Sequence, residues 1–391
     1  MQRSKVRQKR PKLIFAQAKK SVVTRLWAGK INDFCLTIEM PNEIVSIVPP
    51  SQITTMSLPI LFCKRQQRVA LSAVEKRKLA EFSLSQPARS GMADDQQLLS
   101  IVQQHPLSFA SIADSLQALS TEQVISSLLI ENLPIDPELP APPRDGIRPR
   151  GKSACSESAA LQLINACRLK PFSYKEENEK LIHEITPVAG HDRQVSSAGI
   201  AALGFHTDLA ILRAPYQPEF LALAGLRNDA ATPTLIADLD DILAAIRARS
   251  AQLIAPLREP RFRLESPPLL RLWGGKSLRS EPRPLLTAGD LGRETIAANF
   301  NSLTALDPEA ERALLAIQEV LPEVSRELVI GPGELLLLNN QRCLHGRAAI
   351  PQRGQRWLQR TYSRRCLEHL RRATASGPEA VVFGISQLIL E

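Results

Sequence analysis

The chain has 391 residues, of which 44% are apolar, so it can bury a large core as one big domain or two small ones. No stretch approaches the roughly 18 uninterrupted apolar residues of a membrane-spanning helix, so no membrane partner is expected. The formal net charge of +9 is concentrated at the start, because residues 1–30 carry ten Lys or Arg and no acid. The other 39 basic residues are matched by the 40 acidic ones, so the rest of the chain is not expected to bind nucleic acid.

The cysteines indicate the redox environment. There are six, without a close pair or the spacing of a metal site, at positions 35, 63, 155, 167, 343 and 366. Scattered cysteines of this kind are typical of reduced, structural thiols. We therefore expect a cytoplasmic protein.

The opening of the chain differs from the remainder. Residues 1–55 combine the basic stretch with an irregular segment that contains Pro and Ser. Such a tail can be a nucleic-acid-binding arm, a transit peptide or a disordered segment. It can also result from a start site placed too early, because Met56 would make a natural beginning. We expect disorder or a misassigned start, followed by a single domain over residues 56–391.

The first half of that domain is expected to be mainly helical. Apolar and charged positions alternate at helical spacing, which predicts helices over Ala73–Phe82 and Thr121–Leu129. The Pro-rich stretch Leu133–Arg150 should cross the surface without a helix. A further helix is expected over Ala159–Ala166 and a strand over Ile182–Val188.

The second half alternates strands with helices. Phe220–Leu226 and Glu334–Leu338 are short apolar strands, and Ala237–Ile254 is an amphipathic helix. Another helix over Pro308–Val320 has Asp307 as its N-cap and proline at its first position. Strands separated by helical insertions favour a mixed α/β fold that is mainly β. We expect a double-stranded β-helix (jelly roll) core with helical insertions and flanking N-terminal helices.

One pattern points to a metal. His206 and Asp208 form a His-x-Asp pair, and His345 lies far downstream. Alternate residues of an extended strand point the same way, so residues 206 and 208 can reach a common point. Two histidines and one carboxylate can hold a non-haem Fe(II) on one face and leave the other positions open. Alone, the pattern also arises by chance.

A basic segment after His345 argues against a chance occurrence of the His-Asp-His pattern. If residues 356–364 form a strand, five side chains share one face: Arg356, Leu358, Arg360, Tyr362 and Arg364. Buried guanidinium groups need anions, because an unpaired buried charge is very costly. A dicarboxylate and an amino-acid carboxylate would supply them. The alternative is a solvated edge strand with surface arginines.

Two other patterns carry no function. Gly274–Ser277 looks like the end of a phosphate-binding loop, but Leu270 stands where that motif requires glycine. The remaining histidines have no partner at ligand spacing and are expected to be surface or hydrogen-bonded residues: His105, His183, His191 and His369.

The motifs together resemble a known family. The runs 205–208, 226–228, 231–232, 345–347 and 356–360 are similar to those of the clavaminate synthase-like enzymes. These belong to the taurine dioxygenase superfamily of Fe(II)/2-oxoglutarate oxygenases, and the resemblance covers roughly residues 57–375. The chain departs from the family in two ways: Asp208 replaces the commoner Glu, and the loop between His345 and Arg356 is shorter.

The resemblance implies roles for individual residues. His206, Asp208 and His345 would hold Fe(II), to which 2-oxoglutarate and dioxygen would bind. Arg356 would pair with the distal carboxylate of 2-oxoglutarate, assisted by the hydroxyl group of Thr232 or Thr234. Three further residues would contact the substrate: Arg360 at its α-carboxylate, Ser196 and Glu177.

The resemblance also implies a reaction. Enzymes of this family hydroxylate an unactivated carbon of free or carrier-bound amino acids such as Arg, Asn or Lys. Two other functions stay open at this point. One is oxidative cleavage of taurine or another alkylsulfonate, and the other is a jelly-roll binding protein without turnover.

Overall fold

The computed structural model describes residues 36–40, 43–47, 66–87, 92–121, 125–177, 179–266, 278–289, 291–351 and 355–389. The chain divides into two units, Met1–Phe62 and Cys63–Glu391. In the first unit, strands β1 (Leu36–Met40) and β2 (Glu43–Ile47) pair antiparallel. The other residues of the predicted 1–55 tail lie outside the described part of the chain.

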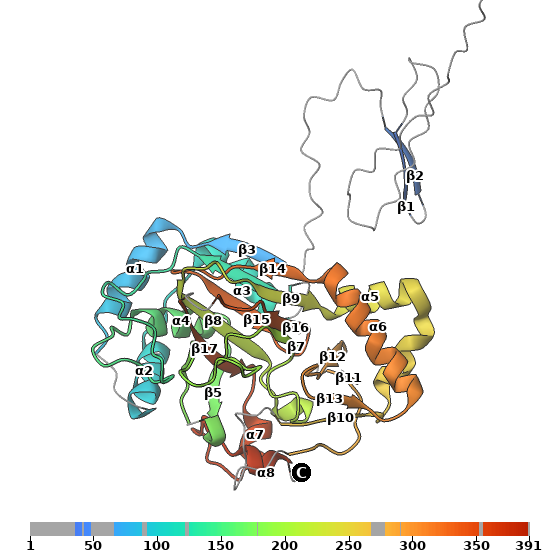
Figure 1. The fold of residues 1–391 in the computed structure, drawn as a ribbon. Helices are drawn as coiled ribbons and strands as arrows, with labels where there is room; N and C mark the ends of the chain where they lie inside the picture. Colours follow the sequence, from blue (N-terminus) through green and yellow to red (C-terminus); the bar gives the residue numbers. More distant parts are fainter. Residues whose placement is uncertain are drawn as a thin grey trace, which may run out of the picture. The chain divides into compact units, whose positions relative to one another are not determined.

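Two sheets form the centre of the second unit (Figure 1). The larger has eight strands, and its path runs β18 (Val382–Phe383), β5 (Lys170–Tyr174), β17 (Arg356–Arg364), β8 (Phe220–Asn228), β15 (Leu335–Asn339), β4 (Ser127–Glu131) and β3 (Gln66–Ala70), with β6 (His183–Ile185) pairing to β17. The smaller has four strands, in the order β14 (Arg326–Leu328), β9 (Thr234–Asp238), β16 (Cys343–Arg347) and β7 (Leu203–His206). Two short antiparallel pairs accompany them, β10 (Phe262–Leu264) with β13 (Leu303–Ala305) and β11 (Leu286–Ala288) with β12 (Glu294–Ile296).

Helices cover the outer side of each sheet (Figure 1). The larger sheet packs against α1 (Ala73–Leu84), α2 (Met92–Gln104), α3 (Ala113–Ser120) and α4 (Cys155–Ala166). The smaller sheet packs against α5 (Leu239–Ser250) and α6 (Pro308–Val324). Two short helices near the end of the chain are α7 (Glu368–Ala373) and α8 (Ile385–Ile389). Among the described residues, no helix has the length and apolar character needed to cross a membrane.

A third apolar cluster lies between the two sheets. It joins Leu221, Leu223 and Leu358 of the larger sheet to Ile236 and Cys343 of the smaller one. Because side chains alternate along a strand, the residues between these point outward to the helices. Trp357 of β17, for example, is fully buried in the cluster formed with α1–α4. The fold is thus mixed α/β, with its strands gathered in two packed sheets.

Several predicted elements are confirmed. The strand over residues 356–364 and the helix starting at Ala73 are present. Helix α6 begins at Pro308, and the Asp307 carboxylate accepts hydrogen bonds from the backbone N–H groups of Glu309 and Ala310. The Pro-rich stretch Leu133–Arg150 contains neither helix nor strand.

Other predicted elements need correction. The helix expected over Thr121–Leu129 is wrong: residues 127–131 form β4, which pairs with β15 and β3. A short, wholly buried apolar run does not distinguish helix from strand, and the position between two strands decides it. The strand expected over Ile182–Val188 is only β6, since Pro187 has no N–H for a ladder. The helix expected from Ala237 starts at Leu239, because Ala237 and Asp238 end β9.

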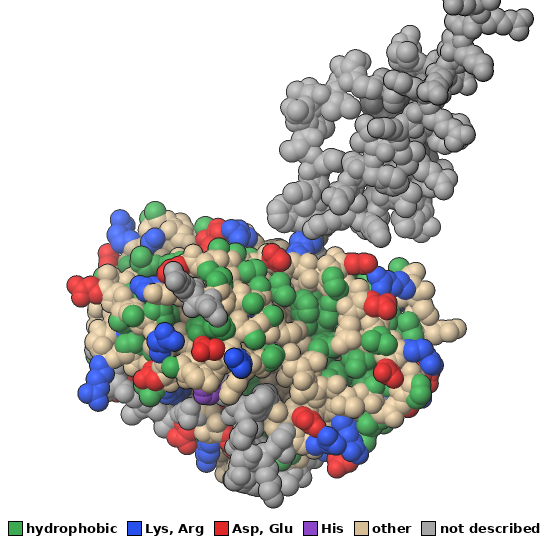
Figure 2. Space-filling view, in the orientation of Figure 1, with side chains coloured by type: hydrophobic (Ala, Val, Ile, Leu, Met, Phe, Trp, Pro, Cys, Tyr) green, Lys and Arg blue, Asp and Glu red, His purple; other side chains and the backbone are tan. Residues whose placement is uncertain are grey.

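On the face seen in Figure 2, basic and acidic side chains are interspersed among apolar ones. This agrees with the near-balance of charges after residue 30. The charged side chains that line the pocket described below lie inside the unit, between the two sheets.

Candidate active site

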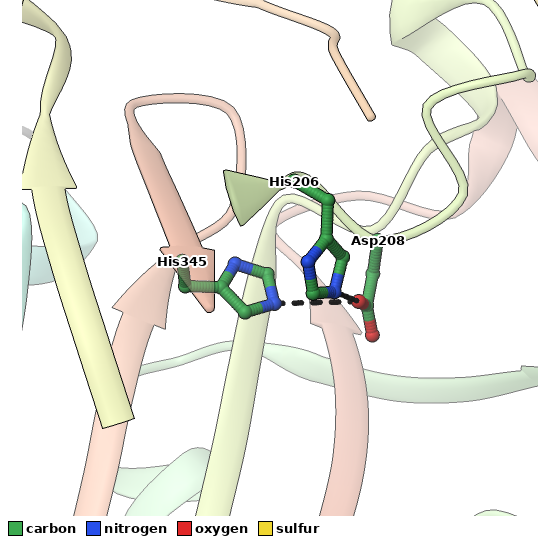
Figure 3. Close-up of side chains that lie close together, drawn as sticks. All are labelled: His206, Asp208 and His345. Atoms are coloured by element: carbon green, nitrogen blue, oxygen red, sulfur yellow. Dashed lines mark ion pairs between the residues drawn. The ribbon is translucent and has the colours of Figure 1, made fainter. Parts of the chain in front are cut away.

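The predicted His-Asp-His triad assembles at the smaller sheet (Figure 3). His206 ends β7 and is paired in register with His345 of β16. The Nε2 atoms of His206 and His345 lie 3.2 and 3.3 Å from the Oδ1 atom of Asp208. The two imidazole rings are 4.4 Å apart. Pairing of neighbouring strands therefore brings together residues that are 139 positions apart in the sequence.

Asp208 reaches this point in a different way from the one predicted. Strand β7 stops at His206, so Asp208 does not lie in an extended strand with it. The chain turns directly afterwards, and Leu209 has φ of +53°. A left-handed conformation is unfavourable for a residue with a side chain, and such strain is found at functional sites. The left-handed residue comes after Asp208, so this turn sets the direction in which the chain leaves the site.

The three donor groups fit a divalent cation. Among the described residues, only His206, Asp208 and His345 form a group of three or more ligand-type side chains with atoms within 4.8 Å of one another. Burial lowers the pKa of His345, which keeps a lone pair on a neutral imidazole. Burial alone would raise the pKa of Asp208, but Arg360 and both imidazoles hold it well below its usual range. Two imidazoles and a carboxylate are a suitable ligand set for Fe(II).

The second oxygen of Asp208 is also engaged. Its Oδ2 atom accepts hydrogen bonds from Nη1 of Arg360 and from the hydroxyl group of Tyr362, both over 2.9 Å. The Arg360 guanidinium lies 4.2 Å from the centre of the Tyr362 ring. Its Nη2 atom donates to Oε1 of Glu177 over 3.2 Å. Arg360 therefore bridges two carboxylates beside the metal ligands.

Arg356 lies on the same side of β17 but has different partners. Its Nη2 atom donates to Oγ1 of Thr234 over 3.2 Å, and its Nε atom has no hydrogen-bond partner within the described part of the chain. Burial, and then the charge of Arg347, lowers the pKa of Arg356 to about 9. Among the described residues no carboxylate pairs with it. Thr232, the other predicted threonine, donates its backbone N–H to Asn228 and has a buried hydroxyl group without a partner.

Several of these side chains line one common pocket. Its wall consists of Ile185, Ser197, Leu203, His206, Asp208, Leu221, Leu223, Thr234, His345, Gly346, Arg347, Arg356, Leu358 and Arg360. Ser197 is part of this wall, and its predicted neighbour Ser196 has a buried hydroxyl group without a partner. Arg364, the fifth member of the predicted face, pairs instead with Glu219 over 2.9 Å.

The structure adds residues that the sequence did not single out. His183, expected to be a surface or hydrogen-bonded residue, is largely buried, with its Nε2 atom 4.0 Å from Oε2 of Glu177. Burial lowers its pKa to about 3, so its imidazole is neutral. Arg347 donates to the carbonyl oxygen of Gly199 over 2.9 Å and to that of Ala201. The signal for Arg347 was present in the run His345-Gly346-Arg347, whereas nothing near His183 in the sequence indicated its neighbours.

The face of β17 opposite the pocket carries a buried polar network. Gln359 donates to Glu157 and Glu184, each over 3.0 Å. Glu157 also pairs with the fully buried Lys152 over 2.8 Å. Burial, and then the neighbouring Glu157, raises the pKa of Glu184. This network attaches β6 and α4 to the strand that carries Arg356 and Arg360.

Comparisons with known proteins agree with this site. The model of the taurine catabolism dioxygenase TauD, TfdA family matches residues 156–362. L-asparagine oxygenase of Streptomyces coelicolor is 30% identical over 262 residues, which cover 64% of this chain and 74% of that protein. Clavaminate synthase 2 of Streptomyces clavuligerus is 24% identical over 275 residues, covering 66% and 79%.

Solved structures of the non-haem iron oxygenase OrfP are also similar. The one in complex with Fe and alpha-ketoglutaric acid is 26% identical and covers 81% of this chain and all of that chain, with a TM-score of 0.66. Another, of a mutant form in complex with (3S)-hydroxy-L-Arg, is 25% identical over 81% of this chain and 99% of that chain, with a TM-score of 0.68. The predicted resemblance is thus confirmed, and this chain belongs to the TauD/TfdA family of dioxygenases.

Proposed function

We propose that this chain is an Fe(II)/2-oxoglutarate-dependent dioxygenase that hydroxylates an unactivated carbon of a free or carrier-bound amino acid. One observation carries the proposal: a complete two-His-one-carboxylate set shares a pocket with a buried arginine that lacks a carboxylate partner among the described residues. The first needs a cation and the second needs an anion. Fe(II) and 2-oxoglutarate supply both.

We also propose that the two packed sheets are the two halves of a double-stranded β-helix. Support comes from the mostly antiparallel pairing within each sheet and from the apolar cluster between them. The triad stands where β7 and β16 of the smaller sheet lie side by side. Such a core gives the ligands rigid strands on which to sit.

His206, Asp208 and His345 would hold the metal. Bound there, Fe(II) would activate dioxygen during the oxidative decarboxylation of 2-oxoglutarate, which releases succinate and carbon dioxide. The chain supplies position and charge. Arg360 and Tyr362 occupy Oδ2 of Asp208, so that only its Oδ1 atom faces the two imidazoles.

Arg356 and Thr234 would hold the distal carboxylate of the co-substrate. Their mutual hydrogen bond of 3.2 Å places a guanidinium and a hydroxyl group together in the pocket wall. Leu221, Leu223 and Leu358 line the same pocket and suit the methylene groups of a dicarboxylate. Thr234 fits this role better than Thr232, because only Thr234 touches Arg356 and lines the pocket.

Arg360, Glu177 and Ser196 would hold the amino-acid substrate. A guanidinium beside a carboxylate matches the carboxylate and ammonium groups of a zwitterion. Arg360 and Glu177 provide this pair within 3.2 Å of each other. One relative named above is an L-asparagine oxygenase, and one similar structure holds (3S)-hydroxy-L-Arg, which supports an amino-acid substrate here. We infer that the reaction takes place in the cytoplasm, in keeping with the free, buried thiols of Cys155, Cys167 and Cys343.

The test is an assay of succinate release by the purified protein with Fe(II), 2-oxoglutarate and each of the common amino acids. A substrate should stimulate succinate release and gain the mass of one oxygen atom. His206→Ala, Asp208→Ala and His345→Ala should each abolish both signals, because two ligands cannot hold Fe(II) facially. Near-native turnover by any of the three, with Fe(II) supplied, would contradict the assignment of the metal centre.

A further inference from the structure

Asn340 makes an unusual set of contacts with the backbone of a metal ligand. It follows β15 and is fully buried. Its Oδ1 atom accepts the backbone N–H of Asp208 over 2.8 Å, and its Nδ2 group donates to the carbonyl oxygen of Asp208 over 3.1 Å. The same Nδ2 group donates to the carbonyl oxygen of Pro218 over 3.0 Å. One carboxamide thus binds both peptide groups of Asp208.

Asp208 depends on these contacts more than the two histidines depend on theirs. His206 and His345 lie in strands β7 and β16, whose pairing holds their backbones. Asp208 lies beyond β7 and is followed by Leu209, with its unfavourable φ of +53°. A backbone under such strain keeps its conformation only when neighbouring groups fix it. Asn340 provides those groups on both sides of the Asp208 Cα atom.

The position of Asn340 in the chain also connects this contact to the strand that carries His345. The backbone N–H of Asn340 donates to the carbonyl oxygen of Glu219 over 2.7 Å, which anchors the turn between β15 and β16. Strand β16 begins at Cys343 and carries His345. Asn340 therefore links the turn that leads to the third ligand with the backbone of the second.

We propose that Asn340 is a positioning residue for the metal centre, which holds the Asp208 carboxylate at the distance from His206 and His345 that a bound cation requires. The inference rests on the proposed function, since it assumes that these three residues bind Fe(II). A carboxamide can donate and accept at once, and this is what the two peptide groups of Asp208 require. Groups that orient metal ligands commonly contribute about 10- to 100-fold to metal affinity.

The experiment measures the affinity of the metal-free protein for Co(II) by calorimetric titration, at a temperature at which every variant is folded. Asn340→Asp keeps the size and one acceptor but replaces the donor with an oxygen that repels the Asp208 carbonyl group. Asn340→Ala removes both contacts, and Asn340→Ser is a milder change if that variant does not fold. We expect Co(II) affinity to fall by about 10-fold or more in each.

Asn339 provides a matched control. It is the preceding residue, equally buried, and its side-chain oxygen accepts the backbone N–H of Gln341 over 3.0 Å. Asn339→Ala should lower the melting temperature but bind Co(II) like the wild type. If the Asn340 variants lose only melting temperature and keep Co(II) affinity, Asn340 is merely structural and the inference is wrong.

The same titration separates this inference from the proposed function. A wild-type protein that binds no more Co(II) than His345→Ala would overturn the metal centre itself, and the role of Asn340 with it. A wild type that binds Co(II), next to Asn340 variants that bind equally well, would overturn the positioning role alone.

Discussion

Arg360 donates a hydrogen bond to Oδ2 of Asp208 over 2.9 Å, so an arginine of the pocket wall and the carboxylate of the His-Asp-His triad form a direct ion pair. Burial alone would lower the pKa of Arg360. Its neighbours Tyr362, Glu177 and Asp208 outweigh this effect and raise the pKa above its usual value. Arg356, four residues earlier on the same strand, has no such partner among the described residues and a pKa of about 9. Arg356 therefore still requires an anionic partner, whereas Arg360 is already paired with carboxylates. The two arginines should respond differently to substitution.

The first prediction compares the two alanine variants. Arg356→Ala should raise the Michaelis constant for 2-oxoglutarate by about 30-fold or more, because losing a buried charged partner costs roughly 2–5 kcal/mol. Arg360→Ala should leave the affinity for 2-oxoglutarate nearly unchanged, weaken amino-acid binding and uncouple succinate release from hydroxylation. Separate titrations of succinate and hydroxylated product measure this. If both variants lost only 2-oxoglutarate affinity, Arg360 would not be a substrate residue.

The second prediction concerns stability without ligands. Arg356→Met should raise the melting temperature of the metal-free protein, because a buried guanidinium without a carboxylate partner among the described residues is costly to desolvate and an apolar side chain is not. The same change at Arg360 should lower it, since Asp208 and Glu177 would then lose their shared cation. Differential scanning calorimetry measures both variants. A lower melting temperature for Arg356→Met would mean that the wild-type guanidinium is already compensated.

The third prediction is a pH dependence at α1. The Glu75 carboxylate accepts from Ser72 and Ser111, and these bonds outweigh burial and lower its pKa from 4.5 to about 2. A carboxyl group whose pKa is lower in the folded than in the unfolded state stabilises the fold at pH values above the unfolded-state pKa. This stabilisation is lost as the pH falls toward the folded-state pKa. Glu75→Gln should therefore destabilise the protein at pH 7, by at most about 3 kcal/mol, and progressively less between pH 4.5 and 2.

Urea denaturation at several pH values measures this difference. Glu81→Gln, on the exposed side of the same helix, is the control and should differ little from the wild type at any pH. A cost for Glu75→Gln that stays constant down to pH 2 would show that the carboxylate charge does not matter.

The fourth prediction concerns the predicted boundary at residues 55/56. A protein that begins at Met56 should have the melting temperature and turnover of the full chain, because the second compact unit starts only at Cys63. Thermal denaturation and the succinate assay compare the two. A clear loss in either would mean that the first unit contributes to the fold or to the reaction.

The positions of the site residues could be predicted best for residues that lie within an expected strand. The arginines of β17 follow from alternation along a strand, and this strand is where it was expected. His345 lies in β16, a separate strand after the one expected over Glu334–Leu338. Asp208 also meets the histidines, but it lies beyond the end of β7 and is followed by a left-handed leucine, which no local pattern predicts. The contacts of Asn340 with Asp208 span 132 positions and depend on the fold as a whole.

The errors in secondary structure have a related cause. Residues 127–131 become a strand because β15 and β3 lie on either side of them, and neither neighbour is close in the sequence. The buried position of His183 likewise results from the pairing of β6 with β17. Local composition contains no information about such partners.

The two faces of β17 carry different side chains, so the number of residues within this strand cannot change freely. Arg356, Leu358 and Arg360 face the pocket, while Trp357 and Gln359 face the helices and the buried polar network. Inserting or deleting one residue inside this strand would exchange the two sets, because side chains alternate with a period of two. The arginines would then lie against α4, and an indole would enter the pocket. Length changes in the loop between β16 and β17 leave this alternation intact, so this loop can differ in length between related chains without exchanging the two faces of the strand.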